Sequence, residues 1–332
     1  MKQYAWGIIG PGKIANKFAA ALQLAGNARL KAVASRDSGR AKAFADAHGA
    51  DTCYDNYEQL AADPHIDAVY VATPHGFHAE HSLLCLRQGK AVLCEKPMAL
   101  NASQVGDMIT ASQNHHSFLM EAMWTRFLPL IRQTDNLIDT GRIGQVKYIR
   151  ADFGFLAPFQ PSSRLYDLRL GGGSLLDIGI YPLFLCLHLL GKPDGIRAAG
   201  HLAASGADET CHALLTYSDG RSAVVSSTLA CQTSLTAEIA GTEGAIRIPT
   251  PWYKNDRLVW NQTGKPDETI QLEPMVNGFE YQIREVARCL DAGLIESPSM
   301  THAFSLTMAE TMDDIRRQIG VQYPTESSAT SG

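Results

Sequence analysis

The sequence predicts an α/β protein of two domains: a doubly wound parallel sheet at the N-terminus, then an α+β domain with a large, mostly antiparallel, open-faced sheet. Three observations support this. A strand runs straight into a glycine-rich turn that opens a helix, strand and helix patterns then alternate as far as Met120, and from residue 144 onward strand patterns follow one another with turn residues between them. A chain of 332 residues is long enough for two domains.

We expect the first domain to span residues 1–121 and the second residues 122–326. The helical pattern over residues 304–319 is a candidate to pack back on the first domain. Residues 327–332 are small and polar, which predicts a flexible tail.

The glycine-rich turn indicates a nucleotide site. It has the form G-x-G-x-x-A and follows the apolar strand of residues 4–9. Gly10 permits a tight turn, and Gly12 lets the backbone approach a pyrophosphate. The helix that begins with Lys13 and Ile14 attracts the anion with its N-terminus. Glycine pairs also form plain turns, so the position between strand and helix is what favours a nucleotide.

The end of the second strand, residues 30–34, favours NADP over NAD. An NAD enzyme usually places a carboxylate here to hold the ribose 2′-hydroxyl, whereas this chain has Ser35. Arg36 and Arg40 follow, and a guanidinium binds a phosphate through two parallel hydrogen bonds. Alternatively, both arginines belong to a solvated helix surface. Asp37 would repel the 2′-phosphate if its side chain turned inward.

The third buried strand, residues 68–72, ends beside the predicted nicotinamide half of the cofactor. We expect cofactor contacts from the four residues Thr73, Pro74, His75 and His78. The alternative is that the two histidines are polar residues at a helix start. Since they have no third ligand at metal spacing, we predict no metal site.

The fourth strand, residues 90–94, delivers Glu95 and Lys96 to the carboxyl edge of the sheet, where open α/β folds bind ligands. Pro97 cannot continue a central ladder and ends the strand. Lys96 is therefore either a surface charge or a chemical group. Asn101 is the expected N-cap of a helix over residues 102–114.

The second half reads as a series of strands, interrupted by one apolar helix. The expected strands are 144–155, 198–203, 210–217, 221–229, 235–240 and 244–248. In the helix, Ser174 is the expected N-cap, Asp177 and Tyr181 are four residues apart and share a face, and Pro182 is expected to kink the helix. A carboxylate and a phenol on a buried helix need partners or a cleft. The alternative is a capped core helix with a satisfied tyrosine.

Composition restricts the partners and the compartment. A net charge of −5 and the absence of a basic run argue against nucleic acid, and we find no apolar stretch of membrane-spanning length and no signal-peptide region. The seven cysteines are scattered, odd in number and lack C-x-x-C spacing, which favours reduced thiols in the cytoplasm and no structural zinc.

The glycine turn, Glu95-Lys96-Pro97, the segment from Glu121 to Phe127 and the segment from Gly171 to Tyr181 together resemble one family. This is the glucose–fructose oxidoreductase/inositol dehydrogenase (Gfo/Idh/MocA) family, in particular its NADP-dependent sugar and dihydrodiol dehydrogenases. The likeness covers nearly the whole chain. It implies an N-terminal Rossmann domain, and homodimers formed through the C-terminal sheet.

The resemblance also implies that Lys96 and Tyr181 act together beside the nicotinamide C4. Oxidising an alcohol requires a base on the hydroxyl as hydride leaves. A cation about 4 Å from a phenol contributes roughly 4 kcal/mol at an effective dielectric of 20, which lowers the phenol pKa. We therefore expect Tyr181 as the acid–base and Lys96 as its tuning cation, with Asp177 binding a second hydroxyl or orienting Lys96. Lys96 as the direct base is the rival assignment.

The implied substrate is a polyol, a sugar or a dihydrodiol. Trp124, Phe153 and Phe279 are candidates for an apolar wall against its ring, and Glu95, Trp124 and Arg126 are expected beside the cofactor. The sequence does not indicate the physiological substrate or the direction of the reaction. An alternative of a different class is a regulator that senses NADP without turning over a substrate.

Overall fold

The computed structural model describes residues 2–324 and divides into two compact units. The first comprises Met1–Arg126 and Asn277–Ala309, and the second comprises Phe127–Val276 and Glu310–Gly332. The first unit includes a later segment, Asn277–Ala309, which the expected division after residue 121 assigns to the second domain. An amphipathic pattern shows which face of a helix is buried, but not which sheet it covers. The predicted tail, residues 327–332, lies outside the described residues.

The first unit is built on a six-stranded parallel sheet in the order β3-β2-β1-β4-β5-β6. Its strands are β1 (Tyr4–Ile9), β2 (Ala28–Ala34), β3 (Thr52–Tyr54), β4 (Ala68–Val71), β5 (Ala91–Glu95) and β6 (Leu119–Ala122). The predicted doubly wound sheet is confirmed. Strands β1, β4, β5 and β6 are buried along their whole length, as their continuous apolar runs require.

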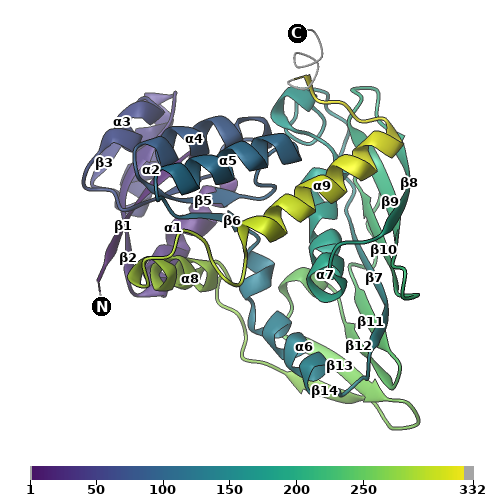
Figure 1. Ribbon diagram of the computed structural model, residues 1–332. Helices are drawn as coiled ribbons and strands as arrows, with labels where there is room; N and C mark the ends of the chain where they lie inside the picture. Colours follow the sequence, from purple (N-terminus) through teal and green to yellow (C-terminus); the bar gives the residue numbers. More distant parts are fainter. Residues whose placement is uncertain (1, 325–332) are drawn as a thin grey trace. The chain divides into compact units, whose positions relative to one another are not determined.

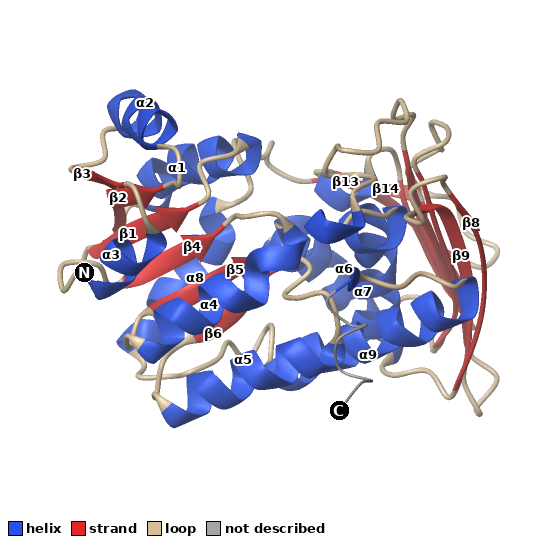
Figure 2. Cartoon of the chain, turned by 90° about the horizontal axis from the view of Figure 1, so that it is seen from above, coloured by secondary structure: helices blue, strands red, loops and turns tan. Residues whose placement is uncertain are grey.

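Helices pack on both faces of this sheet (Figure 2). They are α1 (Lys13–Ala25), α2 (Ser38–His48), α3 (Tyr57–Ala62), α4 (His78–Arg87) and α5 (Ala102–Asn114). The helix α8 (Glu280–Asp291) packs on α1, and the short turns η1 (His75–Phe77) and η2 (Trp124–Phe127) precede α4 and follow β6. One core joins α3, α4, α5 and the start of α9 (His302–Ile319) to Val69 and Val71. On the other face Phe18 of α1 stacks on Tyr70, with ring centroids 3.7 Å apart. The predicted N-cap Asn101 is confirmed, since its side chain accepts from the Gln104 amide.

The second unit contains an eight-stranded sheet in the order β14-β13-β12-β11-β7-β10-β9-β8. Its strands are β7 (Val146–Gly154), β8 (Gly195–Leu202), β9 (Asp208–Thr216), β10 (Ser222–Thr228), β11 (Ala237–Gly241), β12 (Gly244–Ile248), β13 (Arg257–Gln262) and β14 (Glu268–Gln271). All neighbours are antiparallel except β7 and β10. The helices α6 (Pro129–Asp139) and α7 (Ile180–Leu190) lie on one face of this sheet (Figure 1). The short helical turns η3 (Leu168–Leu170) and η5 (Trp252–Lys254) lie in its loops.

The apolar helix of the second unit differs from its prediction at the N-terminal end. Residues Leu175–Gly179 form a π-helix, and α7 follows it directly. Ser174 does not cap this helix with its side chain. The Asp208 carboxylate accepts the Leu175 amide instead, and the Ser174 hydroxyl donates to the same carboxylate. Pro182 is the third residue of α7 and lies shortly after the change from π-helix to α-helix; the expected kink stays a prediction.

The stretch Leu168–Leu190 corrects one expectation. It is 23 residues long with a mean hydropathy of 1.6, which is long and apolar enough to cross a membrane by length and composition. In the structure 89% of its most apolar window is buried inside the protein. A buried core helix passes the same test, so this stretch is weak evidence for a membrane span.

Candidate functional site

The glycine turn has the geometry that a dinucleotide pyrophosphate requires. Gly10 has a φ of +88°, and an added Cβ would lie 2.9 Å from backbone atoms of Ala72, so a side chain is excluded there. Gly12 precedes α1 in extended conformation, with no side-chain cap, and nothing lies within 4 Å of where its Cβ would be. The first amides of α1 and the space beside Gly12 therefore fit an anion. Lys13 and Ile14 follow directly, and both are exposed.

The strand end after β2 presents two cations without an opposing carboxylate. Arg36 and Arg40 are exposed, whereas Ser35 is buried. Asp37 is the N-cap of α2, and its Oδ1 accepts from the Arg40 amide at 2.9 Å. The concern that Asp37 would repel a 2′-phosphate is thereby reduced, because its carboxylate is turned to the helix it caps. The Arg36 guanidinium lies 5.7 Å from the centroid of the Phe77 ring, next to the loop after β4.

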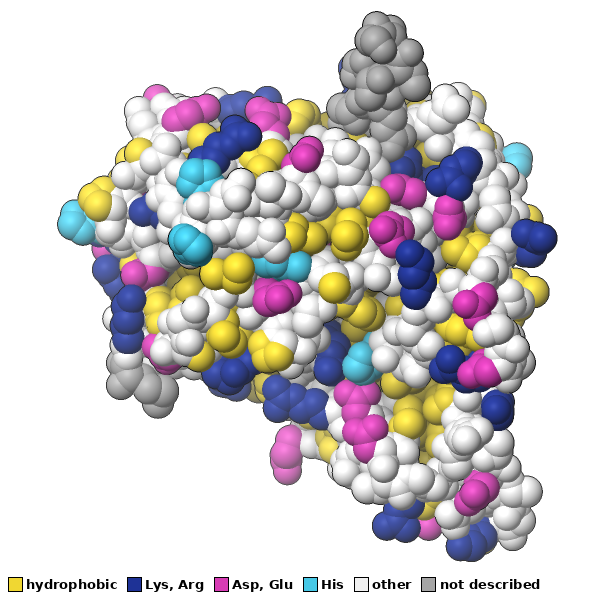
Figure 3. All heavy atoms as spheres, in the orientation of Figure 1, with side chains coloured by type: hydrophobic (Ala, Val, Ile, Leu, Met, Phe, Trp, Pro, Cys, Tyr) yellow, Lys and Arg dark blue, Asp and Glu magenta, His cyan; other side chains and the backbone are white. Residues whose placement is uncertain are grey.

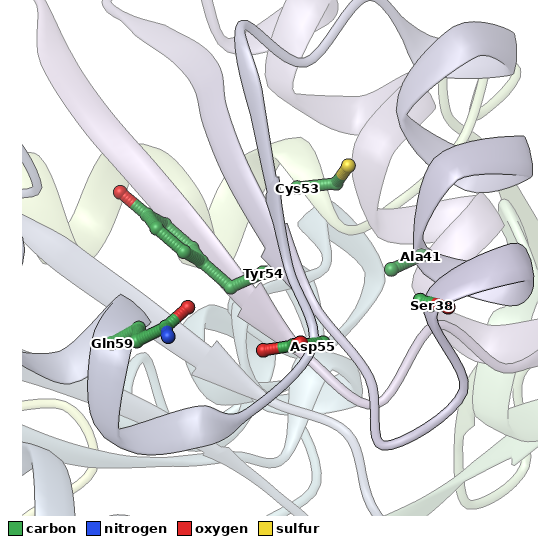
Figure 4. Close-up of a pocket in the computed structure, with 6 residues that line it drawn as sticks. All are labelled: Ser38, Ala41, Cys53, Tyr54, Asp55 and Gln59. Atoms are coloured by element: carbon green, nitrogen blue, oxygen red, sulfur yellow. The ribbon is translucent and has the colours of Figure 1, made fainter.

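A cavity of about 300 Å³ opens beside this strand end. Its lining comes from the start of α2, the end of β3 and the helix α3 (Figure 4). The lining residues are Ser38, Ala41, Cys53, Tyr54, Asp55 and Gln59. The cavity adjoins the predicted phosphate-binding residues but is not lined by Ser35, Arg36 or Arg40.

The loop after β4 separates its two histidines into different environments. His75 is half-buried, whereas His78 is fully buried, with Nδ1 2.7 Å from the Pro97 carbonyl oxygen and Nε2 2.8 Å from that of Thr73. Burial lowers the pKa of His78 to about 4, so the ring is neutral at pH 7 and has a single N–H. His78 thus lies between the loops after β4 and β5 and, while neutral, donates to only one of the two carbonyl oxygens. Its predicted cofactor contact remains a prediction, as do those of Thr73, Pro74 and His75, of which only Pro74 is exposed.

The last residue of β5, Glu95, and the first of the following loop, Lys96, lie in the interior of the first unit, where they are 6% and 9% exposed. The reading of Lys96 as a surface charge is therefore wrong. The Tyr70 hydroxyl donates to the Glu95 carboxylate. Glu121, which sequence reasoning did not select as a site residue, accepts from the Met98 amide at 2.9 Å through Oε1. Its burial raises the pKa of this carboxyl to about 7.

Trp124 and Phe279 come together within the first unit around a lysine. Their ring centroids are 5.1 Å apart, and the Lys17 ammonium lies 4.0 Å from the Trp124 ring and 4.4 Å from the Phe279 ring. Such cation–π contacts stabilise a partly buried ammonium. Arg126 donates from Nε to the Ser299 carbonyl at 3.0 Å. The predicted roles of these residues toward substrate and cofactor stay predictions.

The second unit surrounds Tyr181 with aromatic rings. The Phe153 and Tyr253 centroids lie 5.5 and 5.4 Å from that of Tyr181, and the two rings stack on each other at 4.2 Å. Tyr253 lies in the short turn η5 and is not among the residues predicted for the site. Asp177 accepts from the Arg164 guanidinium at 2.9 Å, and its side chain is 8% exposed, against 60% for that of Arg164. Phe153, Tyr181 and the Arg164–Asp177 ion pair therefore all belong to the second unit.

A second buried carboxyl, Asp208, holds the start of the helix that carries Asp177 and Tyr181. It accepts from the Ser174 hydroxyl at 2.8 Å and from the Leu175 amide at 2.7 Å. Burial raises its pKa to about 6. Nothing local in the sequence marks this residue, because its partners lie 33 and 34 positions away.

No group of three or more histidine, cysteine, aspartate or glutamate side chains within residues 2–324 could hold a metal ion. The first unit offers a glycine turn that fits an anion, a cationic strand end and a buried lysine. The second unit carries a phenol among aromatic rings. These are the groups that binding a dinucleotide and moving a proton require.

Comparison with known proteins agrees with this set of groups. Two family models match the chain: "Oxidoreductase family, NAD-binding Rossmann fold" over residues 4–123 and "GFO/IDH/MocA C-terminal domain" over residues 131–247. Trans-1,2-dihydrobenzene-1,2-diol dehydrogenase of Xenopus laevis is 41% identical over 328 residues, covering 96% of this chain and 99% of the relative. The Sus scrofa enzyme of the same name is 36% identical, covering 96% and 98%.

Among solved structures, KijD10 is similar along almost its whole length. It is a 3-ketoreductase from Actinomadura kijaniata in complex with NADP and TDP-benzene. The TM-score is 0.86 at 27% sequence identity, with 96% of this chain and 98% of that chain covered. Both the two-domain family match and the similarity along nearly the full length of these relatives confirm the predicted family. The chain belongs to the Gfo/Idh/MocA family of oxidoreductases.

Proposed function

We propose that the protein is an NADP-dependent dehydrogenase that oxidises a CH–OH carbon of a trans-dihydrodiol or a sugar. The observation that carries this proposal is the 41% identity with a trans-1,2-dihydrobenzene-1,2-diol dehydrogenase across 96% of the chain. The residues with which a nicotinamide dehydrogenase would work are all present. NADP, when bound, accepts the hydride.

Tyr181 takes the hydroxyl proton as the C–H bond gives up its hydride, and Lys96 stabilises the negative charge on the oxygen. For a trans-dihydrodiol the first product is a hydroxyketone, which tautomerises to a catechol: the hydroxyl-bearing carbon loses its proton and the carbonyl oxygen gains one. Asp177, which accepts a hydrogen bond from Arg164, binds a second hydroxyl of the substrate in this proposal. Phe153 and Tyr253 support a flat or cyclic substrate, because their stacked rings beside Tyr181 form an apolar surface.

The test is an assay of the purified chain with NADP, following NADPH absorbance. The panel contains trans-1,2-dihydrobenzene-1,2-diol, its cis isomer and several aldopyranoses. We expect turnover of the trans-diol or of one sugar, and none with the cis-diol at comparable concentration. NADP binding by calorimetry with no turnover across the panel would refute the proposal and favour the NADP-sensing regulator.

NADP is the preferred cofactor in this proposal, and Arg36 is the residue that selects it. Arg36→Ala is expected to lower kcat/KM for NADP by about 10- to 100-fold and to leave that for NAD nearly unchanged, because hydrogen bonds to charged groups are worth about 1.5–3 kcal/mol. Steady-state rates with both cofactors measure this. Lys42→Ala is the matched control, since Lys42 is a cation of α2 that pairs with Asp46. An unchanged cofactor ratio in Arg36→Ala would contradict the assignment.

We also infer a homodimer formed through the open face of the second sheet. This face exposes Leu214 at 40%, and β9 alternates buried and exposed side chains. A monomer in sedimentation equilibrium would refute the dimer.

We infer no nucleic-acid partner and a reducing compartment. Acidic and basic side chains are interspersed on the molecular face drawn in Figure 3, which is unlike a nucleic-acid surface. All seven cysteines are free, which supports a reducing compartment such as the cytoplasm.

A further inference from the structure

Arg36, the residue that the proposed function assigns to the 2′-phosphate, lies against an aromatic ring. Its guanidinium carbon is 5.7 Å from the centroid of the Phe77 ring, within the range of a cation–π contact. Arg36 follows β2 and Phe77 follows β4, and these two strands flank β1 in the parallel sheet. The contact therefore joins the loops on either side of the glycine turn, at the carboxyl edge where such sheets bind ligands.

The Phe77 ring is itself supported by a buried histidine. It lies nearly parallel to the His81 ring, at 23° with the centroids 5.9 Å apart, and Tyr57 meets His81 in a T-shaped arrangement at 4.5 Å. His81 Nδ1 is 3.0 Å from Thr73 Oγ1, which connects the histidine to the start of the same loop. Burial, and then the Arg36 charge, lower the pKa of His81 to about 4, so its ring is neutral at pH 7 and does not repel the arginine.

The exposure of Arg36 gives this contact a purpose. The side chain lies at the surface, and within residues 2–324 no carboxylate pairs with it. A long side chain that moves freely in solvent loses that freedom when it binds a phosphate, and the loss weakens binding. Because Phe77 is half-buried and packed on His81, its ring can restrain the guanidinium before the cofactor arrives, which reduces this loss.

We propose that Phe77 is a positioning residue for Arg36 and thereby contributes to the preference for NADP over NAD. Its ring restrains the guanidinium beside the site of the 2′-phosphate and touches neither cofactor nor substrate. The inference rests on the proposed function, in which Arg36 binds that phosphate. A Phe77 that acts through Arg36 affects the binding of NADP alone, whereas a Phe77 that touched the adenosine half, which both cofactors share, would affect NADP and NAD equally.

The experiment measures the dissociation constants of NADP and NAD by calorimetry for wild type and Phe77→Leu, so it requires no turnover. Leucine keeps an apolar side chain next to His81 but has no aromatic face. We expect Phe77→Leu to bind NADP about two- to fivefold more weakly, the usual effect of losing an exposed cation–π contact, and to bind NAD as wild type does. Equal weakening of both cofactors, or of neither, would overturn the proposal.

Two further variants control for packing. Phe77→Tyr keeps the ring, so the ratio of its NADP and NAD dissociation constants should equal that of wild type. Phe44→Leu removes another ring of the same unit that packs on a histidine, with its centroid 4.4 Å from that of His48, and should also leave the ratio unchanged. A ratio that shifts in Phe44→Leu as much as in Phe77→Leu would mean that any loss of packing near the strand end has this effect, and the proposal would fail.

The double variant of Arg36→Ala and Phe77→Leu shows whether the ring acts through the arginine. If it does, the second substitution adds nothing to the change in the NADP-to-NAD ratio that Arg36→Ala causes alone, and an additional loss would overturn the proposal. If Arg36→Ala leaves the ratio unchanged, the assignment of Arg36 to the 2′-phosphate has failed, and the positioning role fails with it. If Arg36→Ala changes the ratio and Phe77→Leu does not, only the positioning role has failed. The turnover assay tests the dehydrogenase activity separately.

Discussion

Tyr181→Phe is expected to lower kcat for alcohol oxidation by about 10²- to 10⁴-fold, the usual contribution of a positioned acid–base group. The substitution removes only the hydroxyl. The ring that packs against Phe153 and Tyr253 remains, so the free energy of unfolding should change by less than about 1 kcal/mol. The measurements are steady-state kcat, the NADP dissociation constant by calorimetry, and the thermal midpoint. We expect the last two to match those of wild type.

Lys96→Met is the companion variant that decides between the two candidate bases. If Tyr181 is the acid–base and Lys96 stabilises the oxygen, both variants lose turnover, and only Tyr181→Phe loses the part of the pH profile that reports the phenol. Near-normal turnover in Tyr181→Phe, together with an inactive Lys96→Met, would make Lys96 the base. Because Lys96 is 9% exposed in the first unit, a loss on its removal must be checked against folding by the thermal midpoint.

The features that the sequence predicted best are those that depend on neighbours in the chain. Residues a few positions apart determine the glycine turn, the end of β5 shortly before Pro97 and the Asn101 cap. All three features appear in the structure. The same reasoning could have placed Asp37. An aspartate three residues before a helical amide is the ordinary pattern of an N-cap, and the structure shows this bond.

The features that sequence reasoning missed depend on contacts across the fold. Glu121 meets Met98 across 23 positions, and Ser174 meets Asp208 across 34. A serine before an apolar helix predicts a cap, but here a buried carboxylate from β9 accepts the Leu175 amide in its place, and the Ser174 hydroxyl donates to the same oxygen. Strands β13 and β14 were also missed, because both are short and carry polar residues that weaken the alternation.

Gly173→Ala is expected to destabilise the protein by about 2–5 kcal/mol, the sum of an unfavourable backbone conformation and a clash. Gly173 has a φ of +133°, and an added Cβ would lie 2.2 Å from Oδ1 of Asp208. That carboxyl is fully buried and already bonded to Ser174 and Leu175, so it cannot move away without losing both contacts. Urea denaturation measures the loss, and kcat should fall with it, because the helix carrying Tyr181 begins here.

Gly220→Ala is the matched control. Its φ is +82°, it lies in the turn between β9 and β10 of the same unit, and nothing lies within 4 Å of an added Cβ. Its substitution therefore costs only the backbone term, about 1–2 kcal/mol, and should leave kcat unchanged. The difference between the two variants isolates the contact with Asp208. Equal losses in both would mean that the carboxylate yields to the methyl group, and Asp208 would then not be what fixes the start of the helix.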